Sequence, residues 1–333
     1  MQKRIKLLSV FLLNFCFISC FAIDSKVDID LTVVDDAGVL VEGANVEIRY
    51  PYYDAQKGSR KYKFITDFNG SVKDSNTVET PAKITVIVTK EGYYRTIEYI
   101  DVVFNSEASA LASEINAVER IKKVVLKPIK NPISMHAKYL DRIMIPESNK
   151  VFGFNLKKQD WLEEHSIVSH KDLLLSVNGY WNHSRDQDGY IEIKFSNPGE
   201  GIIKYEYDST SEFKSIYEAP LDGYQSSIKL RKTRIIKNNN QDRTIYSDFK
   251  EHPNPFYYVF RTRCKYDDEG NLIEAYYGKI YGSFEFGGAG PDGSYIKIGT
   301  IFFNPNNLDR NLEFDTSRNL TDVDRKSRRF ILP

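Results

Sequence analysis

Apolar and polar residues alternate along several short stretches near the start of the chain. The alternation covers residues 27–33, 46–50 and 84–88, where an apolar residue or tyrosine occupies every second position. Successive side chains of a β-strand point to opposite faces, so this period of two is typical of strands with one buried face. Polar turns that contain glycine separate the stretches. The pattern predicts a β-sheet structure for the first third of the chain.

Two further features of this region predict local structure. Thr66-Asp67-Phe68-Asn69-Gly70 is a polar turn whose Asn-Gly pair is a strong hairpin signal. Between Phe104 and Arg120, five apolar residues fall at helical spacing and predict a short amphipathic helix. These five residues are Ala108, Leu111, Ala112, Ile115 and Val118.

A second β-rich region begins after residues 127–132, where Pro128 and Pro132 interrupt any regular element. Strand-like stretches then recur to about residue 320 with few helical patterns, which favours an antiparallel sandwich. The predicted strands are 137–145, 172–177, 189–195, 201–207, 226–236, 257–266, 275–286 and 294–303. We expect the basic segment 321–333 to be a solvated tail, with a binding segment as the alternative.

The order of motifs in residues 25–128 resembles the carboxypeptidase regulatory-like family, a small transthyretin-like β-sandwich. The matching residues are Gly38, Gly43-Ala44-Asn45-Val46, Thr66-Asp67, Asn69-Gly70, Lys90-Glu91-Gly92-Tyr93 and Val124-Val125-Leu126-Lys127-Pro128. The predicted helix departs from the family pattern. Family members usually act as folding, docking or surface-display modules, so the resemblance implies a domain over 23–128 without catalytic residues. The whole chain is therefore expected to be all-β, with this small sandwich followed by a larger antiparallel β-sandwich over 129–320.

Composition narrows the classes of function. The 333 residues include 46 Lys plus Arg and 46 Asp plus Glu, so no excess charge directs the chain to nucleic acid or to anionic membranes. Aromatic residues make up 13% of the chain, mostly 22 Tyr and 20 Phe, which suits β-rich packing. We expect no nucleic-acid partner.

The first 22 residues are typical of an export signal, with three basic residues ahead of an apolar segment. That segment is too short for a comfortable membrane span, so we expect no transmembrane span in the mature chain. Two processing routes fit the sequence. Cleavage after Ala22 would release a soluble protein, whereas an imperfect lipobox would make Cys20 a lipidated N-terminus. We favour the first route. Either route predicts a periplasmic, outer-membrane-associated or extracellular protein.

No motif predicts a metal, a cofactor or a catalytic residue. The five histidines lack the spacing of a zinc-binding helix and have no cysteine partners nearby. Asp186-Gln187-Asp188-Gly189 matches only part of a calcium loop and fits a polar hairpin turn better. Cys264 lies in a strand-like stretch, where a buried core position is more common than a nucleophile.

A hydrolase remains an alternative, because a β-sandwich glycosidase can bring two carboxylates together from distant strands. Glu192, Glu206 and Glu285 are the strand carboxylates that could do so. An alternating strand would equally place each of them in solvent.

Aromatic residues gather in the polar stretch between the early strands of the second region. Trp161, Trp181, Tyr180 and Tyr190 are candidates for a ligand platform, since exposed rings can stack on sugar faces. The competing interpretation makes both Trp residues core anchors. We expect a non-catalytic binding or structural module of the bacterial cell envelope, with a polysaccharide or another envelope component as its partner. The alternatives are the hydrolase above and a surface assembly subunit that uses exposed sheet edges.

Overall fold

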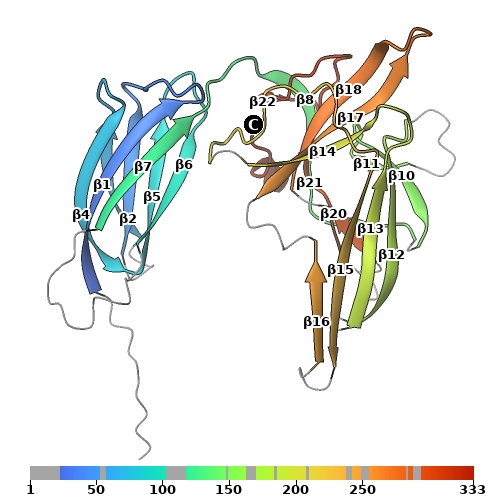
Figure 1. Cartoon of the computed structure of the whole chain (residues 1–333), viewed down its shortest axis with the longest axis horizontal. Helices are drawn as coiled ribbons and strands as arrows, with labels where there is room; N and C mark the ends of the chain where they lie inside the picture. Colours follow the sequence, from blue (N-terminus) through green and yellow to red (C-terminus); the bar gives the residue numbers. More distant parts are fainter. Residues whose placement is uncertain are drawn as a thin grey trace, which may run out of the picture.

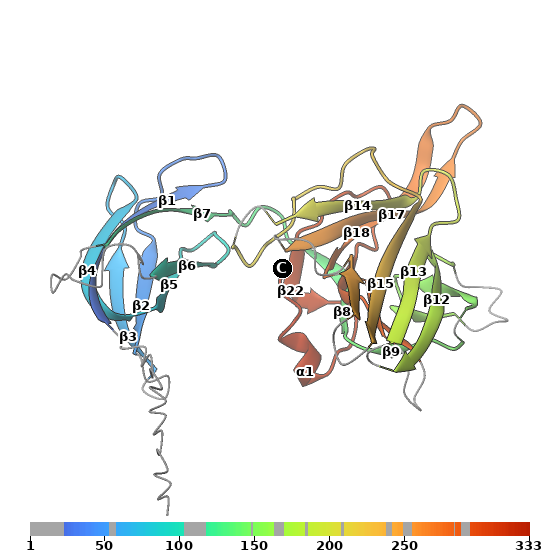
Figure 2. The same cartoon turned by 60° about the horizontal axis from the view of Figure 1, so that its bottom comes forward.

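The chain folds into two lobes built almost entirely from β-strands (Figures 1 and 2). The structure, a computed structural model, describes residues 23–52, 58–102, 118–147, 149–162, 170–183, 186–207, 210–237, 242–248, 255–282, 284–287 and 294–333. Apart from the four-residue helix α1 (Arg325–Arg328), the regular elements of these residues are strands. The predicted fold class, a small β-sandwich followed by a larger antiparallel one, is confirmed.

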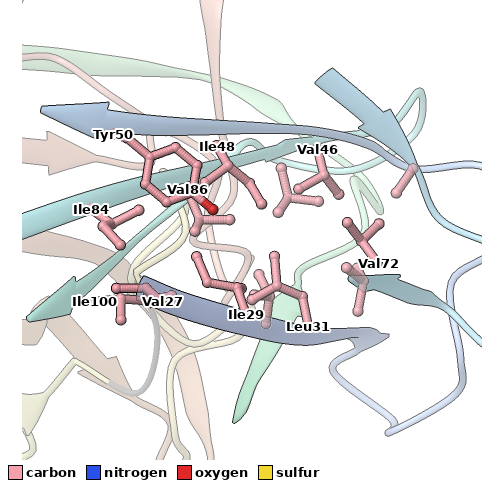
Figure 3. Close-up of a cluster of buried hydrophobic side chains, with 14 of the residues drawn as sticks. Val27, Ile29, Leu31, Val46, Ile48, Tyr50, Val72, Ile84, Val86 and Ile100 are labelled. Atoms are coloured by element: carbon pink, nitrogen blue, oxygen red, sulfur yellow. The ribbon is translucent and has the colours of Figure 1, made fainter. Parts of the chain in front are cut away.

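The first domain packs two sheets face to face. One sheet has the order β4-β1-β7 and the other β3-β2-β5-β6, and only the β1–β7 pair is parallel. Figure 3 shows side chains from both sheets, among them Ile29, Leu31, Ile48 and Val86, meeting in an apolar core. The strands are β1 (Ile23–Asp35), β2 (Asn45–Pro51), β3 (Ser59–Ile65), β4 (Ser71–Thr80), β5 (Ala82–Thr89), β6 (Thr96–Val102) and β7 (Val118–Leu126).

The turn at 66–70 differs from the predicted hairpin. Strand β3 before it pairs with β2, and β4 after it pairs with β1, so the turn carries the chain from one sheet to the other. Gly70 has φ 65°, and a Cβ there would lie 2.5 Å from the Val33 carbonyl oxygen. Glycine is therefore required by this crossing between sheets, and an Asn-Gly pair does not by itself distinguish a crossing from a hairpin.

The predicted helix between Phe104 and Arg120 falls mostly outside the described residues. Its last part, from Val118, is wrong because those residues form the start of β7, paired with β1.

The second domain has two six-stranded sheets around a second core. Their orders are β11-β10-β12-β13-β15-β16 and β14-β17-β18-β21-β8-β22, and a three-stranded sheet β19-β20-β9 adjoins them. The core includes Phe154, Ile191 and Phe303. The strands are β8 (Ile133–Leu140), β9 (Ile143–Met144), β10 (Val151–Asn155), β11 (Asp160–Trp161), β12 (Leu173–His183), β13 (Asp186–Lys194), β14 (Gly201–Glu206), β15 (Ser227–Lys237), β16 (Asp242–Ser247), β17 (Phe256–Tyr266), β18 (Leu272–Tyr281), β19 (Glu285–Gly287), β20 (Tyr295–Lys297), β21 (Gly299–Phe303) and β22 (Phe314–Asn319).

Several predictions for this domain need correction. The predicted strands 137–145, 275–286 and 294–303 each divide into two strands. Strand β12 continues to His183, so residues 178–183 are strand and not the predicted polar turn region. The tail at 321–333 is not simply solvated. Ile331 is buried, and the Phe330 ring stacks on Tyr139 with ring centroids 4.4 Å apart. Apolar residues within the basic tail therefore pack back onto β8.

A buried ion pair joins the two large sheets. Arg263 lies at an irregularity of β17 and has φ 56°, which turns its side chain towards Asp172 beside the start of β12. The Arg263 Nε and Nη2 donate to the two Asp172 oxygens at 2.8 and 2.9 Å. The Asp172 carboxylate also accepts hydrogen bonds from the Leu156 N–H and the Thr262 hydroxyl. Because the Asp172 side chain is fully buried, these four hydrogen bonds must replace its hydration.

The two domains meet along the edge of β6. Thr96 and Ser211 form an isolated antiparallel bridge, flanked by a hydrogen bond from the Glu212 N–H to the Arg95 carbonyl at 2.9 Å. The buried Phe213 ring stacks on Tyr94 at 5.2 Å. A short segment of the second domain therefore extends a sheet of the first.

The buried Glu313 carboxylate holds the same junction from the other side. It accepts hydrogen bonds from the Tyr94 hydroxyl at 2.8 Å and from the N–H groups of Lys130 and Asn131 at 2.8 and 2.5 Å. These donors come from the first domain and from the connecting segment, so one side chain fixes both relative to the second domain.

Lys279 of β18 is fully buried at this junction. Its Nζ lies 2.8 Å from the Tyr281 hydroxyl and 3.1 Å from the Ser215 hydroxyl, and 4.6 Å from the centroid of the Phe213 ring. Burial lowers the pKa of Lys279 well below its usual value, an effect that Glu313 opposes.

We expect that loss of either partner of the Arg263–Asp172 pair destabilises the second domain by about 3–5 kcal/mol, since an uncompensated charge stays buried. Urea unfolding of Asp172→Asn, Arg263→Met and the double variant measures this, with the double variant losing less than the sum of the single losses. Lys265→Met is the control, because it breaks only the exposed pair with Glu274 and should cost under about 1 kcal/mol. If Asp172→Asn and Arg263→Met lose no more stability than Lys265→Met, the buried pair does not stabilise the second domain as we expect.

We expect Lys279→Met to leave stability at pH 7 unchanged or to raise it by up to about 4 kcal/mol, because an apolar side chain needs no compensation in this site. Between the lowered pKa and about pH 10.4, the unfolded wild-type chain binds the proton more tightly than the folded chain, so stability rises with pH. Urea midpoints from pH 7 to 9.5 should rise in the wild type and stay flatter in the variant. A loss of 2 kcal/mol or more at pH 7 would show that the ammonium stabilises the junction.

Candidate functional site

The candidate site is the outer face of the sheet formed by β12, β13, β15 and β16. In β13 the buried positions are Gln187, Gly189, Ile191 and Ile193, so the residues between them point away from the core. We call this side of the sheet, which carries Asp188, Tyr190, Glu192 and their cross-strand neighbours, the outer face.

Strand register arranges the outer face in rows across the sheet. In the first row, Tyr180 pairs with Asp188, Asp188 with Thr233, and Thr233 with Tyr246. Because neighbouring strands are about 4.8 Å apart, the backbones of the two tyrosines at the ends of this row are separated by about 14 Å. Tyr180 is 42% exposed and Tyr246 39%. Two accessible rings therefore bracket a stretch of polar side chains.

The second row holds Asn178, Tyr190 and Arg231, in that order across the strands. Tyr190 is the diagonal neighbour of Tyr180, at a spacing of about 7–8 Å. The Lys229 ammonium lies 3.5 Å from the centroid of the Tyr190 ring, so a ligand that stacks on that ring must displace it.

Hydrogen bonds hold the polar side chains of these rows in place. Arg231 donates through Nε and Nη2 to the two Asp188 oxygens at 3.1 and 2.9 Å, and the Thr233 hydroxyl donates to Asp188 at 2.7 Å. The Tyr246 hydroxyl donates to Asp248. The hydrogen bond from Arg231 is the main reason that the pKa of Asp188 is lowered. The face thus offers the oriented Asp188 and Arg231 side chains between its rings, whereas Thr233 is only 5% exposed and serves to hold Asp188.

The four predicted platform residues are only partly brought together. Tyr180 and Tyr190 share the outer face. Trp161 lies in the edge strand β11, where its ring packs edge-to-face on Phe154 at 5.5 Å and its indole N–H donates to the Met144 carbonyl. It fits the competing interpretation of a core anchor. Trp181 pairs through its backbone with Gln187, and its side chain lies outside the described residues.

Sequence reasoning missed Tyr246. It lies in Asp-Arg-Thr-Ile-Tyr-Ser, which is too polar to stand out as a strand but forms the edge strand β16. Short polar edge strands are common because they discourage sheet-to-sheet association.

The three candidate carboxylates of the hydrolase alternative lie in three different sheets. Glu192 of β13 is ion-paired with Lys194 at 3.0 Å. Glu206 of β14 pairs in register with Phe256, and Glu285 of β19 with Lys297. The register places none of the three opposite another.

Cys264 occupies the core position that the sequence predicts. It is 8% exposed, and burial raises the pKa of its thiol to about 11, which disfavours the thiolate that a nucleophile requires. Among the residues that the structure describes, no group of three or more His, Cys, Asp and Glu side chains is arranged to hold a metal ion. The partial calcium loop at 186–189 belongs to β13, and its Asp188 is paired with Arg231.

Comparison with known proteins adds little to this geometry. No family model matches the chain. No curated protein matches it either. Within the described ranges, no helix is long and apolar enough to cross a membrane.

Several dioxygenases are among the solved structures that share some similarity. The wild-type catechol 1,2 dioxygenase of Acinetobacter radioresistens is 16% identical with a TM-score of 0.25, covering 32% of this chain and 53% of that one. The 3-chlorocatechol 1,2-dioxygenase of Rhodococcus opacus 1CP is 17% identical with a TM-score of 0.25, covering 32% and 61%. The chain thus spans little more than half the length of these proteins, and TM-scores this low carry no argument about fold or chemistry.

We expect Arg231→Met to raise the pKa of Asp188 towards its ordinary value, since the variant removes the main hydrogen bond to the charged carboxylate. Carboxyl-carbon NMR titration measures this pKa, with Lys194→Met as a control that removes a cation paired with Glu192. The interaction stabilises the fold above the ordinary aspartate pKa, and its contribution is lost as the pH falls through the lowered value. An Asp188 titration curve that is the same in Arg231→Met as in the wild type would contradict the pairing.

Proposed function

We propose that the protein is an exported, non-catalytic binding module of the bacterial cell envelope, and that the outer face binds polysaccharide. The observation that carries the proposal is the row of Tyr180, Asp188, Thr233 and Tyr246 across four strands. Two exposed rings, carried by strands whose backbones are about 14 Å apart, with hydrogen-bonding groups held between them, suit a chain of sugar units lying across the strands.

The mechanism would combine stacking on the exposed rings with hydrogen bonds to the polar side chains of the outer face. An open sheet face buries little of a ligand, so the affinity of one site would be weak. If Cys20 is lipidated, anchoring would gather many copies on one surface and strengthen binding through avidity. If cleavage follows Ala22, the protein would act in soluble form. Residues 1–22 lie outside the described part of the chain, so both routes stay proposals.

We propose in addition that residues 23–128 belong to the carboxypeptidase regulatory-like family and act as a docking or display module. Two facing sheets with an apolar core are consistent with that assignment. A hydrolase built on Glu192, Glu206 and Glu285 is the weaker alternative, because Glu192 is already ion-paired with Lys194. An assembly subunit that pairs through a sheet edge such as β16 is the third candidate.

We expect the chain from Ile23 onward to be retained on at least one insoluble polysaccharide or on purified cell wall. Combining Tyr180→Ala with Tyr246→Ala should weaken retention about tenfold, since each aromatic contact contributes about 0.5–1.5 kcal/mol beyond its buried area. Tyr266→Ala is a matched control, because that ring is also 42% exposed but lies in β17 of the other sheet.

Two outcomes would count against the proposal. If the double variant is retained as strongly as the wild type, the binding site does not lie on the outer face. Failure to bind any polysaccharide or cell wall would remove the carbohydrate assignment and leave a protein partner as the next hypothesis.

A further inference from the structure

A groove of about 620 Å³ lies at the junction of the two domains. One wall comes from the edge of β6 and from β7, and the other from Tyr207 and residues 210–214 together with Pro255 and Leu332. Small-molecule sites commonly have volumes of about 300–1,000 Å³ and often lie between domains. The groove is separate from the outer face, which belongs to the second domain alone.

Contacts between the domains fix the walls of the groove. The Ile97 N–H donates to the Thr210 carbonyl at 3.3 Å, and the Thr210 hydroxyl donates to the Glu98 carboxylate. Arg95 forms an ion pair with Glu212 at 2.8 Å. A ligand would therefore enter a site whose two walls are already held together, which lowers the ordering cost of binding.

Three cations among the described residues line the groove, and two of them form ion pairs. Arg95 is paired with Glu212, and Lys122 is paired with Glu98 at 3.0 Å. Lys214 differs: within the part of the chain that the structure describes, no carboxylate lies within ion-pair distance of its ammonium. That ammonium instead lies 5.3 Å from the centroid of the Tyr207 ring. The groove thus holds one cation that lacks a carboxylate partner.

The backbone at Lys214 is tied to the neighbouring strand β18. The Lys214 N–H donates to the buried Tyr281 hydroxyl, which also contacts Ser215 and Lys279. Partial burial lowers the pKa of the Lys214 ammonium, and the charge of Glu212 opposes this effect without forming an ion pair with Lys214. An anion bound beside the ammonium would supply a direct counter-charge in a partly desolvated setting, where a charge-assisted hydrogen bond is stronger than in water.

The rest of the groove is largely apolar. Ile97, Pro255 and the 50% exposed Tyr99 line it, together with Leu332, which is 36% exposed. A strongly hydrated anion such as inorganic phosphate would gain little from these side chains, whereas an anion with an apolar body would bury its carbon surface against them.

We propose that the groove between the domains binds a small organic anion, whose carboxylate or sulfonate group pairs with Lys214 and whose apolar body lies against Tyr99 and Leu332. This proposal is independent of polysaccharide binding by the outer face.

The test uses a matched pair of fluorescent probes, 8-anilinonaphthalene-1-sulfonate and its neutral counterpart N-phenyl-1-naphthylamine, which lacks the sulfonate. We expect the full chain from Ile23 to bind the sulfonate with one-to-one stoichiometry, at least tenfold more tightly than the neutral probe. Lys214→Met should reduce that preference to under threefold, whereas Lys214→Arg keeps the charge and should retain it. Lys194→Met, which removes a lysine outside the groove, is the control.

If Lys214→Met does not fold, a second variant still tests the proposal. Leu332→Asp adds a negative charge at an exposed position of the groove and should weaken binding of the sulfonate at least tenfold by repulsion. Equal affinity for the two probes, or a preference that persists in both Lys214→Met and Leu332→Asp, would overturn the proposal. Retention on polysaccharide by folded Lys214→Met, measured in parallel, separates failure of this site from failure of the outer face.

Discussion

In both domains, every second side chain of the central strands is buried in an apolar core between two sheets. Val27, Ile29 and Leu31 of β1 and Ile191 and Ile193 of β13 are almost completely buried in this way. Close packing leaves such a core little room for a ligand. Recognition is therefore left to the outward-facing half of each strand and to the places where the two domains meet, and both candidate sites lie in such positions.

Polar groups are buried where these packed layers are joined, and each junction depends on satisfying them. Asp172 is surrounded by four hydrogen-bond donors, two of them from Arg263, and Glu313 receives donors from the first domain and from the connecting segment. A buried carboxylate without such partners would cost several kcal/mol. These two side chains specify how the sheets and the domains fit together, because a displaced arrangement would leave a buried charge unpaired.

Much of the fold could be predicted from local pattern. Alternation located β5 and β13, and the glycine-containing turns at Gly38 and Gly92 located the ends of β1 and β5. Three kinds of feature could not be predicted from local pattern. The polar edge strand β16 carries no hydrophobic period, the pairing partners of the strands beside the turn at 66–70 leave no local trace, and the burial of Ile331 depends on a distant strand. The same limit of local pattern applies to the candidate site. Tyr180 and Tyr190 could be selected as aromatic residues in a polar stretch, but their relation to Tyr246 exists only through the register of four strands.

The same register explains why the outer face suits an extended ligand better than a compact one. Its side chains are ordered in rows with the spacing of strands, and the Arg231–Asp188 pair lies between the exposed rings. A compact ligand would contact one ring and remain hydrated elsewhere, whereas a polymer can contact several positions at once. The hydrogen bonds that hold Asp188 and Arg231 would reduce the conformational entropy lost if a polymer binds there, and such preorganisation matters most where each single contact is weak.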